Sequence, residues 1–349
     1  MMLSLKKESF FQYTLSDLQA LFETEGLPAS GPGKLFNWHY KQKHFDPCQK
    51  DIAKISQAFI AEKLSFDLPE IDTVQESSDR TVKFLFKLSD GKKVETVLIA
   101  SNQKYGICLS SQVGCAMKCS FCHTGLQGLE RHLQTFEIVG QFLAAQKWLS
   151  ETRPEDDRIA TIVFMGQGEP LHNFDSVRKA CEIFLSQHGM SMGEDKITIS
   201  TAGYLPGLER WKAEMPDVNI ALSLHSMNTE KRNELIPINA RFPVDKVMEI
   251  VNQIPVTKKR FVIYEYLLAK GFNDSAEDAR ELGEALRGKK AFVNLIPFNP
   301  FPGAKYERPT QEDANSFKAI LDELGVPNLI RFTKGHDILA ACGQLNSKA

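Results

Sequence analysis

The chain has 349 residues, of which 42% are hydrophobic, and a net charge of −2 at pH 7. This length supports one large core with a small additional domain, and the mild charge excludes a global basic field of the kind that attracts nucleic acid by itself. No window approaches the roughly 18 apolar residues of a membrane span and the start lacks a signal-peptide pattern, so we expect no membrane association and a cytoplasmic location.

Residues 1–75 are predicted to be helical and to form a small accessory domain, which we expect to bind RNA. The segment TLSDLQALFETEG offers Thr14 or Ser16 as an N-cap, followed by apolar residues at helical spacing. Further helices are expected over about 32–43 and 51–62, after the Gly- and Pro-rich break GLPASGPG.

Local basic patches are the candidates for RNA contact. The segment KLFNWHYKQKHF interleaves aromatic residues with Lys34, Lys41 and Lys43, a combination that suits base stacking and phosphate contact. For such a short helix, rings packed inward with solvated lysines are the more frequent arrangement. Two other patches, Lys258–Arg260 and Arg287–Lys290, are equally compatible with a solvated surface.

Residues 76–104 are predicted to form a β-hairpin extension. The strands VKFLFKL (82–88) and VETVLIA (94–100) flank the turn SDGKK. From about residue 105 to 349, apolar strands alternate with amphipathic helices in six βα units and a closing strand, NLIRFT. This α/β pattern predicts a partial (β/α)6 barrel, in which functional groups gather on the loops at the carboxyl ends of the strands.

Three of the seven cysteines, Cys115, Cys119 and Cys122, form a C-x3-C-x2-C motif in the loop after the first of these strands. Three thiolates can ligate three irons of a [4Fe–4S] cluster and leave the fourth iron open, whereas ferredoxin-type ligation needs another cysteine nearby. A zinc site usually takes four ligands in paired blocks, and no second block follows. Cys108 or His123 could in principle complete a zinc site, so this alternative stays open.

The motif, with Phe121 before its last cysteine, is the signature of the radical S-adenosylmethionine (SAM) superfamily. The wider stretch CLSSQVGCAMKCSFCHTGLQG resembles the RlmN/Cfr branch, which methylates adenine carbons in RNA, and the resemblance extends to CGQL near the end of the chain. It implies a barrel of the radical SAM type, a [4Fe–4S] cluster on Cys115, Cys119 and Cys122, and SAM bound at the open iron. His123 departs from the small residue found at this place in the family.

Further loop residues match positions that contact SAM in the family. The loop FMGQGEP allows close approach of a ligand at its glycines, and the other matches also lie at ends of predicted strands. The resemblance assigns the cofactor site to Gly168, Glu169, Ser200, Ser223, Leu224, His225 and Asn299. Taken singly, polar residues such as Ser200 and His225 are more often satisfied core or turn groups.

Three residues outside these loops carry the catalytic roles that the resemblance implies. Cys342 in AACGQL would receive a methyl group from a first SAM, and a radical made from a second SAM would then activate that methyl group for addition to adenine. Cys108 matches the cysteine that releases the product by forming a disulfide, and Glu95 matches the proton acceptor. Without the resemblance, Glu95 would be a solvated hairpin residue. Cys181 is predicted to be a core residue, and Cys48 matches no motif.

The resemblance therefore implies methylation at C2 of a specific adenine in 23S ribosomal RNA, and also of an adenine beside the anticodon in transfer RNA. It implies an electron donor such as flavodoxin or ferredoxin and a monomeric enzyme. The alternative within the family is methylation at C8, the Cfr reaction. The alternative from another class is an RNA-binding protein stabilised by zinc, in which Cys342 is inert.

Overall fold

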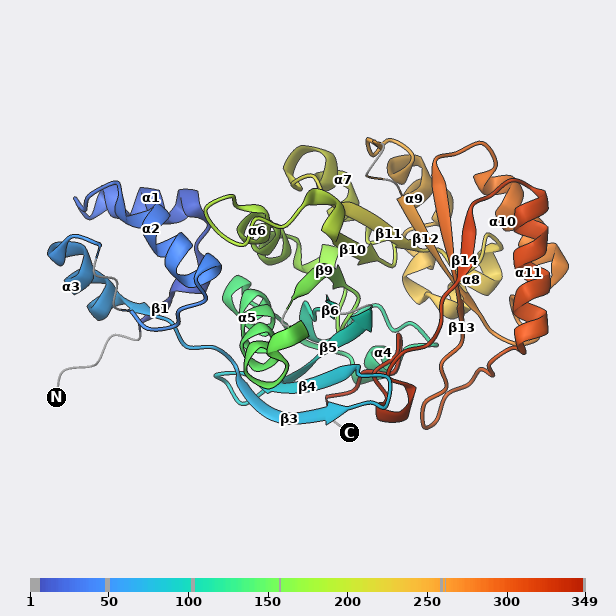
Figure 1. Cartoon of the computed structure of the whole chain (residues 1–349). Helices are drawn as coiled ribbons and strands as arrows, with labels where there is room; N and C mark the ends of the chain where they lie inside the picture. Colours follow the sequence, from blue (N-terminus) through green and yellow to red (C-terminus); the bar gives the residue numbers. More distant parts are fainter. Residues whose placement is uncertain are drawn as a thin grey trace.

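The computed structural model describes residues 7–47, 51–101, 104–156, 158–257, 260 and 262–347 (Figure 1). Cys48 and two members of the patch Lys258–Arg260 lie outside these residues. Within the described ranges, no helix combines the length and the apolar character needed to cross a bilayer.

The N-terminal part is a small helical unit at one end of the molecule (Figure 1). Its helices are α1 (Leu15–Thr24), α2 (Gly31–Phe36), which continues as a π-helical turn over Asn37–Lys41, and α3 (Lys54–Lys63). Thr14 and Asp17 form a reciprocal capping box that starts α1. Two short parallel strands, β1 (Glu8–Ser9) and β2 (Leu64–Ser65), join the two ends of the unit.

The aromatic residues of this unit point mainly inward. Phe36, His39 and Tyr40 are buried beside Phe10, while Trp38 is half-buried and stacks on His44 with ring centroids 3.9 Å apart. The inward packing expected as the more frequent arrangement is therefore found for most rings. The buried rings belong to the same continuous hydrophobic core as the sheet and its helices, so the helical unit is packed onto the rest of the molecule.

One ten-stranded sheet carries the rest of the chain, in the order β14-β13-β12-β11-β10-β9-β6-β5-β4-β3. Seven neighbouring strands are parallel and follow chain order. They are β6 (Lys104–Cys108), β9 (Ile159–Phe164), β10 (Ile197–Thr201), β11 (Asn219–Ser223), β12 (Val262–Leu268), β13 (Ala291–Pro297) and β14 (Asn328–Ile330). This confirms the α/β class and the partial barrel, which is open because β14 and β3 have free outer edges.

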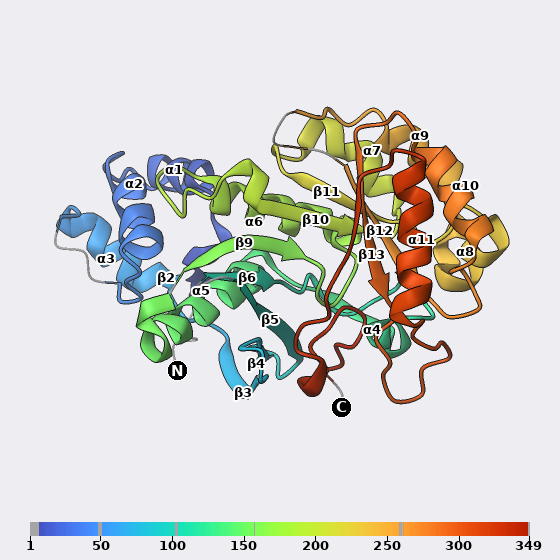
Figure 2. The same cartoon turned by 45° about the vertical axis from the view of Figure 1, so that its right-hand side comes forward.

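Helices cover the outer side of the curved sheet (Figures 1 and 2), and the main core lies between them and the strands. The helices are α5 (Thr135–Thr152), α6 (Phe174–Leu185), α7 (Leu205–Glu214), α8 (Thr229–Leu235), α9 (Val244–Val251), α10 (Ala276–Leu286) and α11 (Gln311–Glu323). Short 3-10 helices lie at Phe10–Gln12, Pro154–Asp156, Pro170–Asn173, Glu194–Lys196, Pro237–Ala240 and His336–Ile338. Cys181 is fully buried on α6, as predicted.

The predicted hairpin is present as β4 (Val82–Lys87) and β5 (Lys93–Ser101), and β5 continues the sheet by pairing with β6. The prediction that residues 1–75 are helical is wrong at its end, because Glu70–Glu76 forms a further strand, β3, on β4. Only Ile71 and Val74 of β3 are partly buried against the core. An exposed edge strand needs no continuous apolar run, so the polar sequence EIDTVQE gave little strand signal.

The C-terminal segment returns from β14 to the hairpin side of the sheet and lies beside α4 (His123–Gln127) (Figures 1 and 2). Hydrogen bonds connect this segment to the β-hairpin and to the loop before it. The Gly335 amide donates to Asp79 at 3.0 Å, and the Lys83 ammonium donates to the Leu339 carbonyl at 3.4 Å. This closure places Cys342 over the carboxyl ends of the parallel strands.

Candidate active site

Two adjoining pockets meet at Cys342. The first, which we call the cofactor pocket, has about 880 Å³ of space including its mouth. The second, the cysteine pocket, has about 600 Å³ and contains Cys108. Met165, Ile296 and Cys342 belong to both walls. Part of the Cys342 surface is accessible from these pockets, although protein surrounds its thiol.

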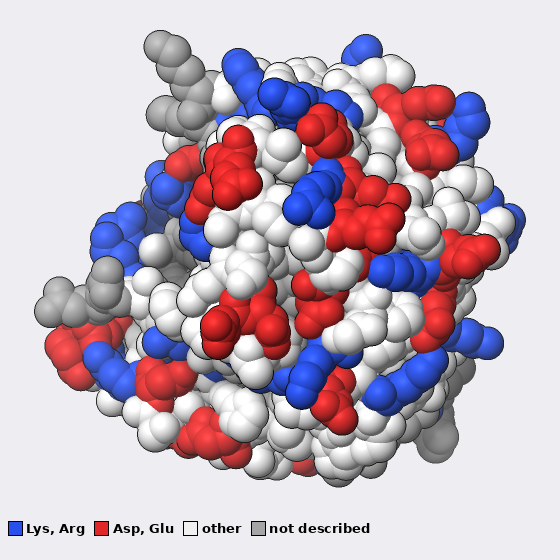
Figure 3. Space-filling view, turned by 90° about the vertical axis from the view of Figure 1, so that its right-hand side faces the viewer, with Lys and Arg blue, Asp and Glu red and all other residues white. Residues whose placement is uncertain are grey.

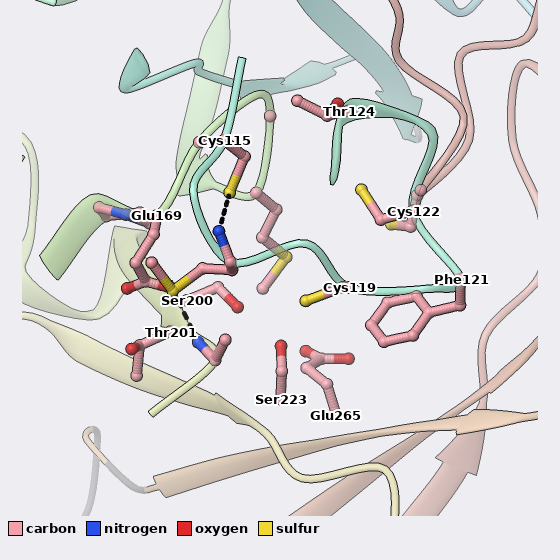
Figure 4. Close-up of a pocket in the computed structure, with 18 of the residues that line it drawn as sticks. Cys115, Cys119, Phe121, Cys122, Thr124, Glu169, Ser200, Thr201, Ser223 and Glu265 are labelled. Carbon is pink, nitrogen blue, oxygen red and sulfur yellow. Dashed lines mark hydrogen bonds between the residues drawn. The ribbon is translucent and has the colours of Figure 1, made fainter. Parts of the chain in front are cut away.

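The three motif cysteines line the cofactor pocket. Figure 4 shows Cys115, Cys119 and Cys122 around one space, with Ser223 and Glu265 on its opposite side. The loop begins after β7 (Gln112–Gly114), which pairs with β8 (Leu129–His132), and its last cysteine directly precedes α4.

The path of this loop depends on a close backbone contact at Gly114. Gly114 has φ 73°, and a Cβ atom there would lie 1.8 Å from the Gly128 carbonyl oxygen. The Cys115 amide donates to the same carbonyl at 3.0 Å, and the Ser120 amide donates to the Leu235 carbonyl at 3.0 Å. The cysteines are therefore held in place by the surrounding backbone.

Burial raises the pKa of the Cys115 thiol to about 12, and burial likewise raises the pKa of Cys119 and Cys122. Buried thiols of this kind ionise readily only when a metal ion or a nearby cation supplies compensating charge. The guanidinium of buried Arg232 favours the thiolate of Cys119 in this way. Three thiols around one pocket fit a cluster, since each would bind a different iron.

Arg232 was not predicted as a site residue. Its guanidinium donates to the backbone carbonyls of Ala202, Ser223 and Leu224 at 3.0–3.1 Å, and to Asn239 Oδ1 at 2.6 Å. These bonds tie together the ends of β10 and β11, which border the cofactor pocket. A single arginine on a short polar helix carries no sequence signal for such a role.

The loop after β9 contributes Gly168 and Glu169 to the wall of the cofactor pocket. Gly168 has φ 104°, and a Cβ atom there would lie 2.6 Å from Gln112 Cβ. Glu169 accepts hydrogen bonds from the amides of Leu171 at 3.1 Å and Ala202 at 2.8 Å. Burial raises the pKa of its carboxyl to about 7, against the opposing effect of these bonds.

Ser200, Ser223 and His225 also line the cofactor pocket, on the carboxyl ends of neighbouring strands. Burial lowers the pKa of His225 to about 3, so its ring is neutral, and Nδ1 accepts the Leu267 amide at 3.0 Å. Leu224 is fully buried and does not line the pocket; its amide donates to the Glu265 carbonyl at 3.0 Å.

Asn299 lies in the cysteine pocket and is absent from the lining of the cofactor pocket. Its Nδ2 donates to the Cys342 carbonyl at 3.2 Å, while Oδ1 accepts from Arg308 at 2.9 Å and from Thr333 at 3.0 Å. In this structure Asn299 therefore positions the Cys342 backbone. Its predicted contact with SAM remains a prediction.

Cys108, at the end of β6, lines the cysteine pocket together with Cys342, although the two are far apart in the sequence. Burial raises the pKa of Cys108 to about 12, and it also raises the pKa of Cys342. The Arg331 guanidinium opposes both shifts, because its positive charge favours each thiolate. Arg331 Nη1 lies 3.9 Å from Glu265 Oε1, which also accepts from Asn294 at 2.8 Å.

Glu95 is buried, so it is not the solvated hairpin residue that its sequence context alone would suggest. Its Oε1 forms an ion pair with buried Lys83 at 2.9 Å, and Oε2 accepts the Asn346 amide at 2.5 Å. Because Lys83 also donates to the Leu339 carbonyl, this ion pair holds both ends of the segment that carries Cys342. Glu95 lines neither pocket.

His123 is held by the C-terminal segment. Its ring stacks on Phe301 with centroids 4.8 Å apart, and Nε2 lies 2.8 Å from Asn346 Nδ2. It does not line the cofactor pocket. This arrangement gives no support to His123 as the fourth ligand of a zinc ion.

Comparisons with known proteins agree with this geometry. The family model of the radical SAM superfamily matches residues 109–283. A relative from Aquifex aeolicus, described as a probable dual-specificity RNA methyltransferase RlmN, is 41% identical over 96% of each chain. A dual-specificity RNA methyltransferase RlmN from Gluconobacter oxydans is 39% identical over 95% of this chain and 84% of its own.

A solved structure is also similar over nearly the whole chain. The crystal structure of a radical SAM methyltransferase from Sphaerobacter thermophilus superposes with a TM-score of 0.89 at 36% identity. The match covers 97% of this chain and 99% of the other.

Proposed function

The chain belongs to the RlmN family of radical SAM RNA methyltransferases, and we propose that it methylates C2 of a specific adenine in 23S ribosomal RNA and in transfer RNA. The dual specificity named for its relatives supports two classes of RNA substrate. The observation that carries the proposal is the place of Cys342, which belongs to the walls of both pockets.

The cofactor pocket would hold SAM. Cys115, Cys119 and Cys122 would hold a [4Fe–4S] cluster, and Glu169 would accept a hydrogen bond from the amino group of SAM; all four residues line this pocket. Bound to these cysteines, the cluster would supply the electron that cleaves SAM to methionine and a 5′-deoxyadenosyl radical. An external donor such as flavodoxin or ferredoxin would deliver that electron.

Cys342 would carry the methyl group. Its thiolate attacks the methyl carbon of SAM, a carbon–sulfur bond forms, and the sulfonium becomes the neutral thioether of S-adenosylhomocysteine. Arg331 assists because its charge favours the thiolate. The methylated sulfur then stands where the two pockets meet.

Cys108 and Glu95 would take part in the steps that follow activation of the methyl group on Cys342. The 5′-deoxyadenosyl radical would take a hydrogen atom from the S-methyl group, and the resulting carbon radical would add to the ring carbon of adenine. The adduct would then return one electron to the cluster and lose the ring proton. The family resemblance assigns this proton to Glu95, which would have to leave its ion pair with Lys83 because it lines neither pocket in this structure.

The Cys108 thiolate would then attack the sulfur of Cys342 and form a disulfide. The electron pair of the broken carbon–sulfur bond would pass to the methylene carbon on the RNA, which takes up a proton and becomes the methyl group. The presence of both cysteines in one pocket supports this role.

Nucleoside analysis by mass spectrometry tests the proposed regiochemistry. The cluster-bearing protein, RNA, a reductant and methyl-labelled SAM should yield labelled 2-methyladenosine. Labelled 8-methyladenosine alone would identify the C8 reaction instead, and an absence of methylated adenosine would refute the proposal.

A further inference from the structure

The RNA must reach Cys342 from outside, and the charged surface does not by itself show where. The face formed by α10 and α11 mixes acidic and basic side chains (Figure 3). On this side of the molecule Arg287, from one of the predicted basic patches, pairs with Glu284 at 3.4 Å. The side chains around the mouth of the cysteine pocket therefore indicate the RNA-binding surface better than the overall distribution of surface charge does.

One side chain at that pocket is unusual for its exposure. The Phe332 side chain lines the cysteine pocket, and yet the residue is 86% exposed. The residues on both sides of it are anchored, because the Arg331 amide donates to the Leu295 carbonyl at 2.8 Å and the Thr333 hydroxyl donates to Asn299 at 3.0 Å. Arg331 and Thr333 are half-buried, whereas Phe332 and Lys334 are exposed, so the anchored neighbours leave the Phe332 ring toward solvent.

Lysines continue from this ring along the surface. Lys334 lines the cysteine pocket and also the next hollow, where Lys104 and Arg80 lie. Among the described residues, neither Lys334 nor Lys104 has an acidic partner within ion-pair distance. The acidic groups of this hollow are engaged: Asp156 pairs with Arg80, and Asp79 accepts the amides of Thr81 and Gly335.

An exposed aromatic ring followed by unpaired lysines is the combination with which proteins bind single-stranded nucleic acid, since rings stack on bases and ammonium groups contact phosphates. We propose that Phe332 and Lys334 form a nucleotide subsite at the mouth of the cysteine pocket. The Phe332 ring stacks on an unpaired base of the RNA substrate, and Lys334, followed by Lys104, contacts its phosphate backbone. This subsite rests on the RNA substrate of the proposed function, and it does not depend on which adenine carbon is methylated.

Binding of an RNA stem-loop with an unpaired adenine to the full-length, cluster-bearing protein tests the subsite. Loss of one base–aromatic stack in Phe332→Ala should weaken RNA binding by about 5- to 150-fold. Phe332→Leu should weaken it similarly although it keeps an apolar side chain, while Phe332→Tyr should bind like the wild type. Leu329→Ala is the matched control, because Leu329 is an exposed apolar residue on β14 that lines neither pocket.

The salt dependence tests Lys334 separately. Lys334→Ala should reduce the slope of log affinity against log salt concentration by about 0.7, the value for one phosphate contact on a single strand. Lys318→Ala is the control, because Lys318 lies on α11 and pairs with Asp322. An unchanged slope for Lys334→Ala would show that Lys334 does not contact an RNA phosphate and is not part of the subsite.

Methylation of Cys342 by SAM, read from the intact protein mass, reports separately on the cofactor pocket; it should be the same in the control Leu329→Ala and the wild type, because Leu329 lines neither pocket. RNA affinity that is unchanged in both Phe332→Ala and Phe332→Leu would overturn the subsite. Weakened affinity in a protein that forms no 2-methyladenosine would support the subsite and contradict the proposed function. The two proposals can therefore fail independently.

Discussion

The two pockets that meet at Cys342 differ in how they are built. The cofactor pocket is formed by one short cysteine loop and the ends of successive strands, and the charged groups Glu169 and Arg232 are buried around it. The cysteine pocket combines the end of β6 with segments near the C-terminus, and Phe332 at its mouth is exposed. The first suits a small cofactor kept away from water, and the second suits a large substrate that arrives from outside.

The largest effects are expected from replacement of a single cysteine in each pocket, because the two variants should lose different activities. Cys119→Ala should abolish cluster binding and therefore all SAM cleavage, while Cys342→Ala should retain the cluster but lose methylation of the protein at this position and of the RNA. Iron content and the visible absorption of anaerobic protein report on the first pocket, and methylated adenosine reports on the second. RNA methylation by the Cys342→Ala variant would contradict the role of Cys342 as the carrier of the methyl group.

Cys108→Ala should block the last step only. Without a second thiol, the bond between Cys342 and the RNA cannot be broken by disulfide formation, so a protein–RNA adduct should accumulate. Denaturing gel electrophoresis with labelled RNA measures it. Cys181→Ala is the matched control, because Cys181 is buried in α6 away from both pockets; an adduct of equal yield in both variants would contradict the role of Cys108.

Removal of one partner from the buried ion pair between Lys83 and Glu95 should strongly lower the stability of the fold. Lys83→Met leaves Glu95 buried without its partner, which should lower the free energy of unfolding by about 3 kcal/mol. Lys87→Met on the same strand removes an exposed pair with Glu70 and should cost less than about 1 kcal/mol. Urea unfolding of both variants tests this contrast, and the double variant Lys83→Met, Glu95→Gln should recover part of the loss. Equal losses in the two single variants would contradict it.

A smaller effect is expected from the titration of Glu169. With a pKa of about 7, its carboxyl is mostly protonated below that pH and cannot pair with the ammonium of SAM. Affinity for SAM, measured without reductant, should therefore fall by up to about tenfold as the pH is lowered from about 8 to about 6. Glu169→Gln should bind weakly at both pH values. An affinity in the wild type that does not change with pH would argue against this contact.

The sequence predicted the cofactor pocket better than the cysteine pocket. A local motif identifies Cys115, Cys119 and Cys122, and residues at ends of parallel strands must share one edge of the sheet, so the convergence of Ser200 and Ser223 followed from the strand pattern. The partial barrel followed from the same alternation. Nothing in the local sequence reports that Lys83 pairs with Glu95, or that Arg232 joins two strand ends.

These contacts depend on how the chain closes. Cys108, Asn299 and Cys342 come together only because the C-terminal segment crosses back to the hairpin side of the sheet. Phe332 would be an ordinary strand residue in a sequence pattern, and its exposure is known only from the structure. The edge strand β3 was missed for a related reason, since its polar residues face solvent on an outer edge.

The central claim is that Cys342 passes a methyl group from one pocket to the other. The direct test uses full-length protein whose Cys342 has been methylated with a deuterated methyl group and freed of SAM, followed by RNA, reductant and unlabelled SAM. We predict that the adenosine methylated in the first turnover contains deuterium from the protein. Methylated adenosine without deuterium in that turnover would contradict the account.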